Sequence, residues 1–213
     1  MEPPSTQDST LAVDTLVPIP PLSQDFLRTL DIVSDMAVGN ALLFYSRVYF
    51  SSGGKIILRE DQILAGVRYH ERQSVIKIAR TGSGKTMQII IAALMNPRQI
   101  ILVLSPLLRL QDSMVDEINK DFAGVRAIAI NHALRNNFEA WKGIEAGMYN
   151  IIITSPEQCK TINGHSTRLH TLLCKNKTWP KQISGVVVDE AHGKHGLDGE
   201  YGLAREYGVD GGD

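Results

Sequence analysis

The sequence predicts an α/β protein in which a mostly parallel sheet is flanked by helices. Three observations support this fold class, and the first is a set of continuous apolar runs of strand length: Ile100 to Leu104, Asn150 to Thr154 and Ile183 to Val188. Runs of this kind are typical of strands that are buried on both faces. Second, segments with helical spacing of apolar residues separate the runs, and alternating strands and helices favour parallel pairing. Third, a glycine-rich turn over residues 79–86 joins the β-branched run Val75 to Ala79 to a helical segment, as expected of a ligand-binding loop at the carboxyl end of a strand.

Length and composition indicate one globular domain with a sizeable core, because the chain has 213 residues, of which 43% are hydrophobic and 21% charged. The net charge of −1 means that any nucleic-acid binding must come from a local surface. The two cysteines, Cys159 and Cys174, form no disulfide framework or metal-ligand spacing, which favours a reduced intracellular compartment. We see no signal peptide and no apolar run long enough to span a membrane.

The N-terminal part of the chain is expected to be a tail followed by helices. Residues 1–21 are rich in Pro, Ser, Thr and Asp, which predicts a disordered tail. Residues 22–57 carry apolar residues at helical spacing, which predicts an N-terminal helical segment of one or two helices, broken near Gly39. Ile56 to Tyr69 predicts a further helix, in which the acidic pair Glu60-Asp61 suits the first turn.

Weaker patterns fill the rest of the chain. The remaining predicted elements are a helix over Leu107–Phe122, a strand over Val125–Ile130, a helix over Phe138–Met148, and short helices or irregular structure over Pro156–Ile162 and Ser166–Cys174. Residues 193–213 are rich in glycine with little periodicity, and we interpret them as a degenerate tail. The stretch from Cys159 to Lys181 holds five Lys or Arg residues and no acid, which indicates either a solvated face or a contact with nucleic acid.

The turn over residues 79–86, A-R-T-G-S-G-K-T, has the features of a phosphate-binding loop. Gly82 and Gly84 permit positive φ angles, so that successive N–H groups can converge on an anion at a helix N-terminus. Lys85 would then reach the β- and γ-phosphates, and the Thr86 hydroxyl would bind Mg²⁺. The alternative is a glycine-rich turn that carries an exposed lysine.

A second chemical motif, Asp189-Glu190-Ala191-His192, follows the last predicted strand. An acid at this position holds Mg²⁺ in enzymes with a phosphate-binding loop, so we assign that role to Asp189 together with Thr86. Glu190 is then placed to orient and deprotonate the attacking water, and His192 to link the nucleotide state to a neighbouring domain. Lys85 completes the candidate catalytic set. The alternative is that Asp189 and Glu190 only cap a helix.

These residues resemble the motifs of a known family. The segment Ala79 to Thr86 is similar to motif I of superfamily 2 helicases, in which alanine is common at the first position, and Asp189 to His192 is similar to their motif II. Three more segments resemble the RecQ branch. Leu58 to Gln62 is similar to the element whose glutamine reads adenine, Ser105 to Asp112 to motif Ia, and Thr154 to Glu157 to motif Ib.

The resemblance implies a RecA-like P-loop NTPase lobe over residues 58–192, the ATP-binding lobe of a RecQ-type 3′–5′ DNA helicase. It implies ATP and Mg²⁺ as cofactors, single-stranded or partly duplex DNA as partner, a second helicase lobe acting in trans, no membrane, and the nucleus as location. The implied cofactor-binding residues are Arg59, Gln62, Thr81, Gly82, Ser83, Gly84, Lys85 and Thr86. The implied nucleic-acid contacts are Ser105, Pro106, Leu107, Thr154, Ser155 and Pro156.

The sequence also departs from the resembling family. After His192 it lacks the Trp and Phe of the RecQ aromatic-rich loop, and motif III and the second lobe with its arginine finger do not follow. We therefore expect the isolated chain to be inactive, and a non-catalytic remnant that binds nucleotide or DNA is the alternative. In the family, the motif III strand lies between the strands of motifs I and II. Residues 75–79 and 183–188 should therefore pair directly, leave an open gap, or be covered poorly by residues 193–213.

Overall fold

The computed structural model describes residues 18–78, 84–134, 136–162 and 164–189. Within these residues, the centre of the fold is a parallel sheet with the strand order β2-β3-β1-β6. Its strands are β1 (Ile100–Leu104), β2 (Ala127–Ile130), β3 (Ile151–Thr154) and β6 (Ile183–Val188). A separate antiparallel hairpin pairs β4 (Thr161–Ile162) with β5 (His165–Ser166). The predicted α/β class with a parallel sheet is confirmed.

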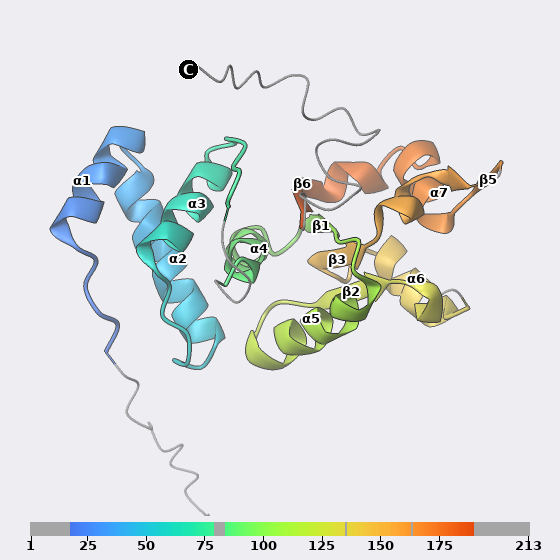
Figure 1. Ribbon diagram of the computed structural model, residues 1–213, viewed down its shortest axis with the longest axis horizontal. Coiled ribbons are helices and arrows are strands. Elements are labelled where there is room, and N and C mark those ends of the chain that lie inside the picture. The colour runs from blue at the N-terminus through green and yellow to red at the C-terminus, as the bar shows by residue number, and fades with distance from the viewer. Residues whose placement is uncertain (1–17, 79–83, 135, 163, 190–213) are drawn as a thin grey trace, which may run out of the picture.

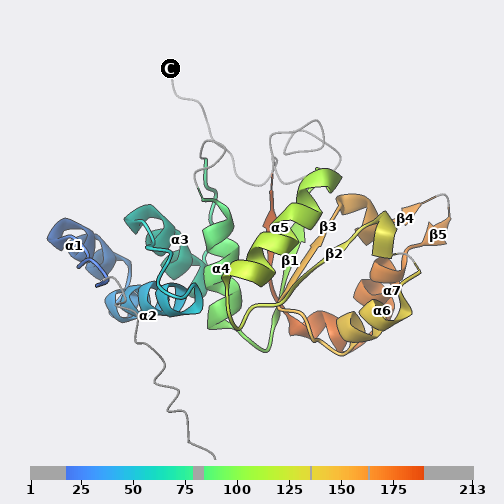
Figure 2. The ribbon, with the colours of Figure 1, turned by 90° about the horizontal axis from the view of Figure 1, so that it is seen from below.

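Helices enclose the sheet on both faces (Figures 1 and 2). They are α1 (Gln24–Val33), α2 (Ala37–Ser51), α3 (Glu60–His70), α4 (Thr86–Met95), α5 (Leu108–Asp121), α6 (Phe138–Glu145) and α7 (Arg168–Lys175), with short 3₁₀ turns η1 (His132–Leu134), η2 (Pro156–Cys159) and η3 (Trp179–Gln182). Helices α4 and α5 cover one face, α6, α7 and η3 cover the other, and α1 to α3 continue outward from α4 (Figure 2). No helix in the described ranges has the length and apolar character needed to cross a membrane.

Alternation along the central strands explains the two cores. Ile101, Ile151 and Ile153 point to the α4–α5 side, whereas Ile100 and Ile152 point to the α6–α7 side, because successive side chains of a strand face opposite sides of the sheet. Both faces are therefore apolar, as the continuous apolar runs predicted.

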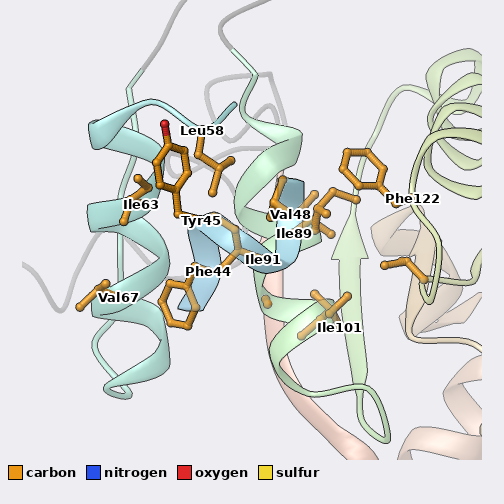
Figure 3. Close-up of a cluster of buried hydrophobic side chains, with 14 of the residues drawn as sticks. Phe44, Tyr45, Val48, Leu58, Ile63, Val67, Ile89, Ile91, Ile101 and Phe122 are labelled. Carbon is orange, nitrogen blue, oxygen red and sulfur yellow. The ribbon is translucent and has the colours of Figure 1, made fainter. Parts of the chain in front are cut away.

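The N-terminal helices belong to the larger of these cores. Phe44 of α2 and Ile63 of α3 pack with Ile91 of α4 in one buried cluster (Figure 3). The predicted helical segment does consist of two helices, but the break lies at residues 34–36, a few residues before the predicted position, and Gly39 belongs to the first turn of α2. The helical segment therefore packs directly beside the helix that follows the glycine-rich turn.

The Asn150 side chain fixes the register of three strands at their amino ends. Its Oδ1 accepts a hydrogen bond from the Arg126 N–H at 2.9 Å, and its Nδ2 donates to the Pro97 carbonyl at 2.6 Å. The Ile101 N–H donates to the Asn150 carbonyl at 2.8 Å. Because these strands start level, their carboxyl ends also reach one edge together.

Two predictions about the sheet are wrong. The run Val75 to Ala79 was predicted to be a strand, but its described part, residues 75–78, is not one, and Ile76 and Ile78 are 78% and 97% exposed. β6 was predicted to be buried, yet Val186 and Val188 are 54% and 46% exposed. Among the described strands only β1 pairs with β6, and no described strand lies beside residues 75–78.

Among the described residues, a cavity separates these two segments. A cavity of about 850 Å³ is lined by Ser74, Val75 and Lys77 on one side and by Val186 to Asp189 on the other. Direct pairing of residues 75–78 with β6, one of the three expected outcomes, is therefore not observed. The possible cover, residues 193–213, lies outside the described residues.

Candidate functional site

Three of the predicted site residues line this cavity together. Lys85 and Thr86 lie at the start of α4, and Asp189 lies directly after β6. The Asp189 N–H donates to the Leu104 carbonyl at 2.9 Å, which holds the aspartate level with the end of β1. These three residues thus lie near the carboxyl ends of parallel strands, where ligands bind in open α/β sheets.

Gly84 marks the end of the predicted phosphate loop. Its φ of +67° lies in the left-handed region, and an added Cβ would fall 2.5 Å from Gln62 Nε2. A side chain at this position would therefore be both strained and obstructed. The rest of the loop, Ala79 and Thr81 to Ser83, lies outside the described residues.

Gln62 joins the start of α3 to that loop. Its Oε1 accepts from the Arg59 N–H at 2.9 Å, and its Nε2 donates to the Gly84 carbonyl at 3.1 Å. One N–H and one lone pair of the carboxamide are left for another partner. The adenine-reading role of Gln62 and the cofactor-binding role of Arg59 stay predictions. The structure adds a hydrogen bond that connects the segment containing Gln62 with the end of the phosphate loop.

Tyr69 closes the cavity from the end of α3. Its ring lies against Gly185 of β6, where an added Cβ would overlap the phenol. Burial raises the pKa of the Tyr69 phenol, and the Ser184 hydroxyl and the Arg72 charge offset this only in part. The tyrosine therefore stays neutral and forms a wall of the cavity.

The two segments predicted to bind nucleic acid lie side by side. The Ser105 N–H donates to the Thr154 carbonyl at 2.8 Å, which joins the ends of β1 and β3. Their hydroxyls are nevertheless buried, and Thr154, at 0% exposure, donates its Oγ1 hydrogen to the Ile130 carbonyl at 3.1 Å. Ser155 is also buried. The predicted contact of these hydroxyls with phosphates is thus not open in this arrangement, and the accessible members of the set are Pro106, Leu107 and Pro156.

Gln111 is a site-supporting residue that sequence reasoning missed. Its buried Nε2 donates to the Ser105 carbonyl at 2.9 Å, which fixes the loop between β1 and α5. A usable signal existed, because Gln111 and the buried Ile118 lie on the same face of α5, two turns apart. A polar residue on a core-facing stripe indicates a buried hydrogen bond.

The basic stretch divides into structural and solvent-facing cations. Arg168 forms two hydrogen bonds to Glu145, at 2.7 and 3.1 Å, and its guanidinium lies 4.7 Å from the Trp141 ring centroid. Arg168 therefore belongs to the packing of α7. For Lys175 and Lys181, which are exposed, the two interpretations given above stay open.

Few of the described residues are candidates for binding a metal ion. In the ranges that the structure covers, no three His, Cys, Asp or Glu side chains come together as a metal site. Thr86 and Asp189, the predicted Mg²⁺ ligands, both line the cavity. Glu190 and His192 lie outside the described residues, so their roles stay predictions.

Comparison with known proteins agrees with this geometry. Residues 59–200 match the family model described as DEAD/DEAH box helicase. The matched range includes Gln62, Lys85 and Asp189 and covers most of the chain. No curated protein matches the sequence.

Proposed function

Because the chain belongs to the DEAD/DEAH box helicase family, we propose that it is the ATP-binding lobe of a RecQ-type DNA helicase that uses Mg²⁺. Family membership implies ATP binding and nucleic-acid binding. The RecQ type, the choice of DNA and the metal are the finer parts of the proposal.

One observation carries the proposal: Lys85, Thr86 and Asp189, which lie at the start of α4 and directly after β6, all line one cavity beside the sheet. The Lys85 ammonium can neutralise phosphate charge, and the Thr86 hydroxyl and Asp189 carboxylate are the oxygen ligands that Mg²⁺ prefers. Gly84, with its positive φ, lets backbone approach an anion at the start of α4. Bound ATP would supply a phosphoanhydride bond, and Glu190 is the proposed base for the attacking water.

The RecQ type is supported by the order and placement of three further segments. Leu58 to Gln62 precedes the phosphate loop and contacts it through the Gln62–Gly84 hydrogen bond. Ser105 to Asp112 and Thr154 to Glu157 follow in the RecQ order, and the hydrogen bond between Ser105 and Thr154 joins them. DNA would lie over the exposed part of this edge, where Leu107 is accessible.

Calorimetric titration with Mg-ADP tests the nucleotide site. The wild-type chain should bind, and Lys85→Ala should weaken binding by at least about tenfold, because it removes a charge-assisted phosphate contact. The matched control is Lys142→Ala on α6, whose ammonium pairs with Glu139 at an exposed site far along the chain. Equal affinity of the wild type and Lys85→Ala would refute the assignment.

Anisotropy titrations with single-stranded DNA and RNA of the same base sequence test the finer proposal. We expect tighter binding to DNA, with an affinity that falls as salt rises. Tighter binding to RNA would exclude the RecQ type and leave the helicase family in place.

A further inference from the structure

The first turn of α3 contacts the described residues on both sides of residues 79–83. Gln62 binds the Gly84 carbonyl at the end of the loop. The neighbouring carboxylate, Asp61, binds Lys77 Nζ at 2.7 Å, just before the loop begins. Two adjacent residues of one helix thus contact the segment that precedes residues 79–83 and the residue that follows them.

Lys77 makes a second contact that reaches α4. With the Gln88 carboxamide oriented so that both of its atoms are satisfied, its oxygen accepts from Lys77 Nζ at 2.8 Å and its nitrogen donates to the Lys85 carbonyl. The Lys77 side chain is only 19% exposed, whereas Ile76 and Ile78 on either side face solvent. One ammonium therefore joins α3, the segment before the loop and the first turn of α4.

Electrostatics keep Asp61 ionised. Burial alone would raise the pKa of the Asp61 carboxyl, but the hydrogen bonds and positive charges of Lys77 and Arg59 outweigh burial and lower it. The Asp61 side chain is about half exposed, and exposed ion pairs add little to stability. The contact between Asp61 and Lys77 therefore matters more for where it holds the chain than for how strongly it stabilises the fold.

We propose that Asp61 is a positioning residue that acts through Lys77 to set the start of the phosphate loop, and so the affinity for the phosphates of a nucleotide. The inference rests on the proposed nucleotide site. Its physical basis is that a loop binds an anion well only when its ends hold the N–H groups in the binding geometry. Asp61 and Gln62 share one helical turn, so the separation of their two contacts is fixed by a rigid element.

The experiment compares Asp61→Asn, Lys77→Met and the double variant in titrations with Mg-ADP and with Mg-pyrophosphate, which lacks a base. Each single variant should lose about tenfold in affinity for both ligands, and the double variant should lose no more than either single one, because the two side chains act as a pair. Reversing the charges with Asp61→Lys and Lys77→Asp together should recover part of the loss. The matched control is Asp25→Asn, which removes an exposed ion pair with Arg28 on α1 and should change neither affinity.

Contrary outcomes are distinct. Wild-type affinity in Asp61→Asn would overturn the inference while the proposed function stands. Additive losses in the double variant would also overturn the inference. So would a weaker affinity for ADP with an unchanged affinity for pyrophosphate, because that result would place the effect of Asp61 at the base and not at the phosphates. A folded wild type that binds neither ligand would overturn the proposed function and this inference with it. Circular dichroism establishes folding, and if Asp61→Asn does not fold, Asp61→Glu takes its place and should weaken both affinities by less than Lys77→Met.

Discussion

β3 and β6 are both short apolar strands that lead to a polar residue at the carboxyl edge of the sheet, Thr154 as the last residue of β3 and Asp189 directly after β6, yet only β3 is buried. All of its residues are inaccessible, whereas Val186 and Val188 of β6 are about half exposed. β3 has β1 and β2 as neighbours and helices on both faces, while β6 pairs with β1 alone among the described strands. Burial thus depends on what covers the strand, not on the apolar run itself.

The less enclosed of these regions carries the candidate site. Lys85, Thr86 and Asp189 surround the cavity beside β6, whereas β3 and its helices form the scaffold behind it. Sites that bind and release ligands draw on parts of a protein with fewer buried contacts. The predictions below test this contrast between β3 and β6.

The largest expected effect is on stability. Ile153→Ala in β3 should reduce the free energy of unfolding by about 2–5 kcal/mol, since it leaves a cavity in a packed core. Val188→Ala in β6 should change it by less than about 0.5 kcal/mol, since the side chain is half exposed. Urea unfolding of the two variants measures both values, and similar losses would show that β6 is as enclosed as β3.

A loss of stability of intermediate size is expected at Gly185, where β6 packs against Tyr69. Gly185→Ala should cost about 1–3 kcal/mol, because the added methyl group overlaps the Tyr69 ring. In a Tyr69→Ala background the same substitution should cost little, since the obstacle is gone. Thermal melting of the four proteins in this cycle gives the coupling, and independent effects would contradict the contact.

The smallest expected effect concerns pH. The pKa of the Asp61 carboxyl is lowered in the folded chain, so its contribution to stability is present above the unfolded pKa of about 3.9 and is lost as pH falls through the folded value. The stability difference between wild type and Asp61→Asn should therefore be small at pH 7 and shrink toward zero in acid. Denaturant unfolding at several pH values measures it, and a difference that grows in acid would exclude an ionised Asp61.

The sequence could predict those parts of the fold that depend on the residues of one segment, but not those that depend on contacts between segments. The bounds of β1 and β6 follow from the apolar runs, because composition and length alone mark a strand of a parallel sheet. Residues 75–78 have equally strong strand propensity, but a strand also needs a hydrogen-bonded neighbour, which the segment itself cannot specify. The break between α1 and α2 was misplaced for a related reason, since tertiary packing overrides the weak propensity of Gly39.

The candidate site divides in the same way. Lys85, Thr86 and Asp189 could be placed together because phosphate chemistry demands these residue types at strand ends. The inward orientation of the Thr154 hydroxyl could not be foreseen, since it depends on the Ile130 carbonyl of another strand. The sequence position of Asp61 indicates only a residue suited to the first turn of a helix. Its ion pair with Lys77 depends on how two separate segments pack together, which the sequence of either segment does not specify.

The strand order also bears on how the chain folds as it is made. β1 lies between β3 and β6, and both of these neighbours are synthesised after it. β3 follows about 50 residues later, a delay of roughly 3–10 s at a ribosomal rate of 5–20 residues per second. During that interval the IILVL run has two unpaired edges and is the kind of segment that chaperones shield from aggregation. Among the described strands, the first pair of the sheet can therefore form only when β3 has been synthesised, and until then the edges of β1 are open to pairing with other chains.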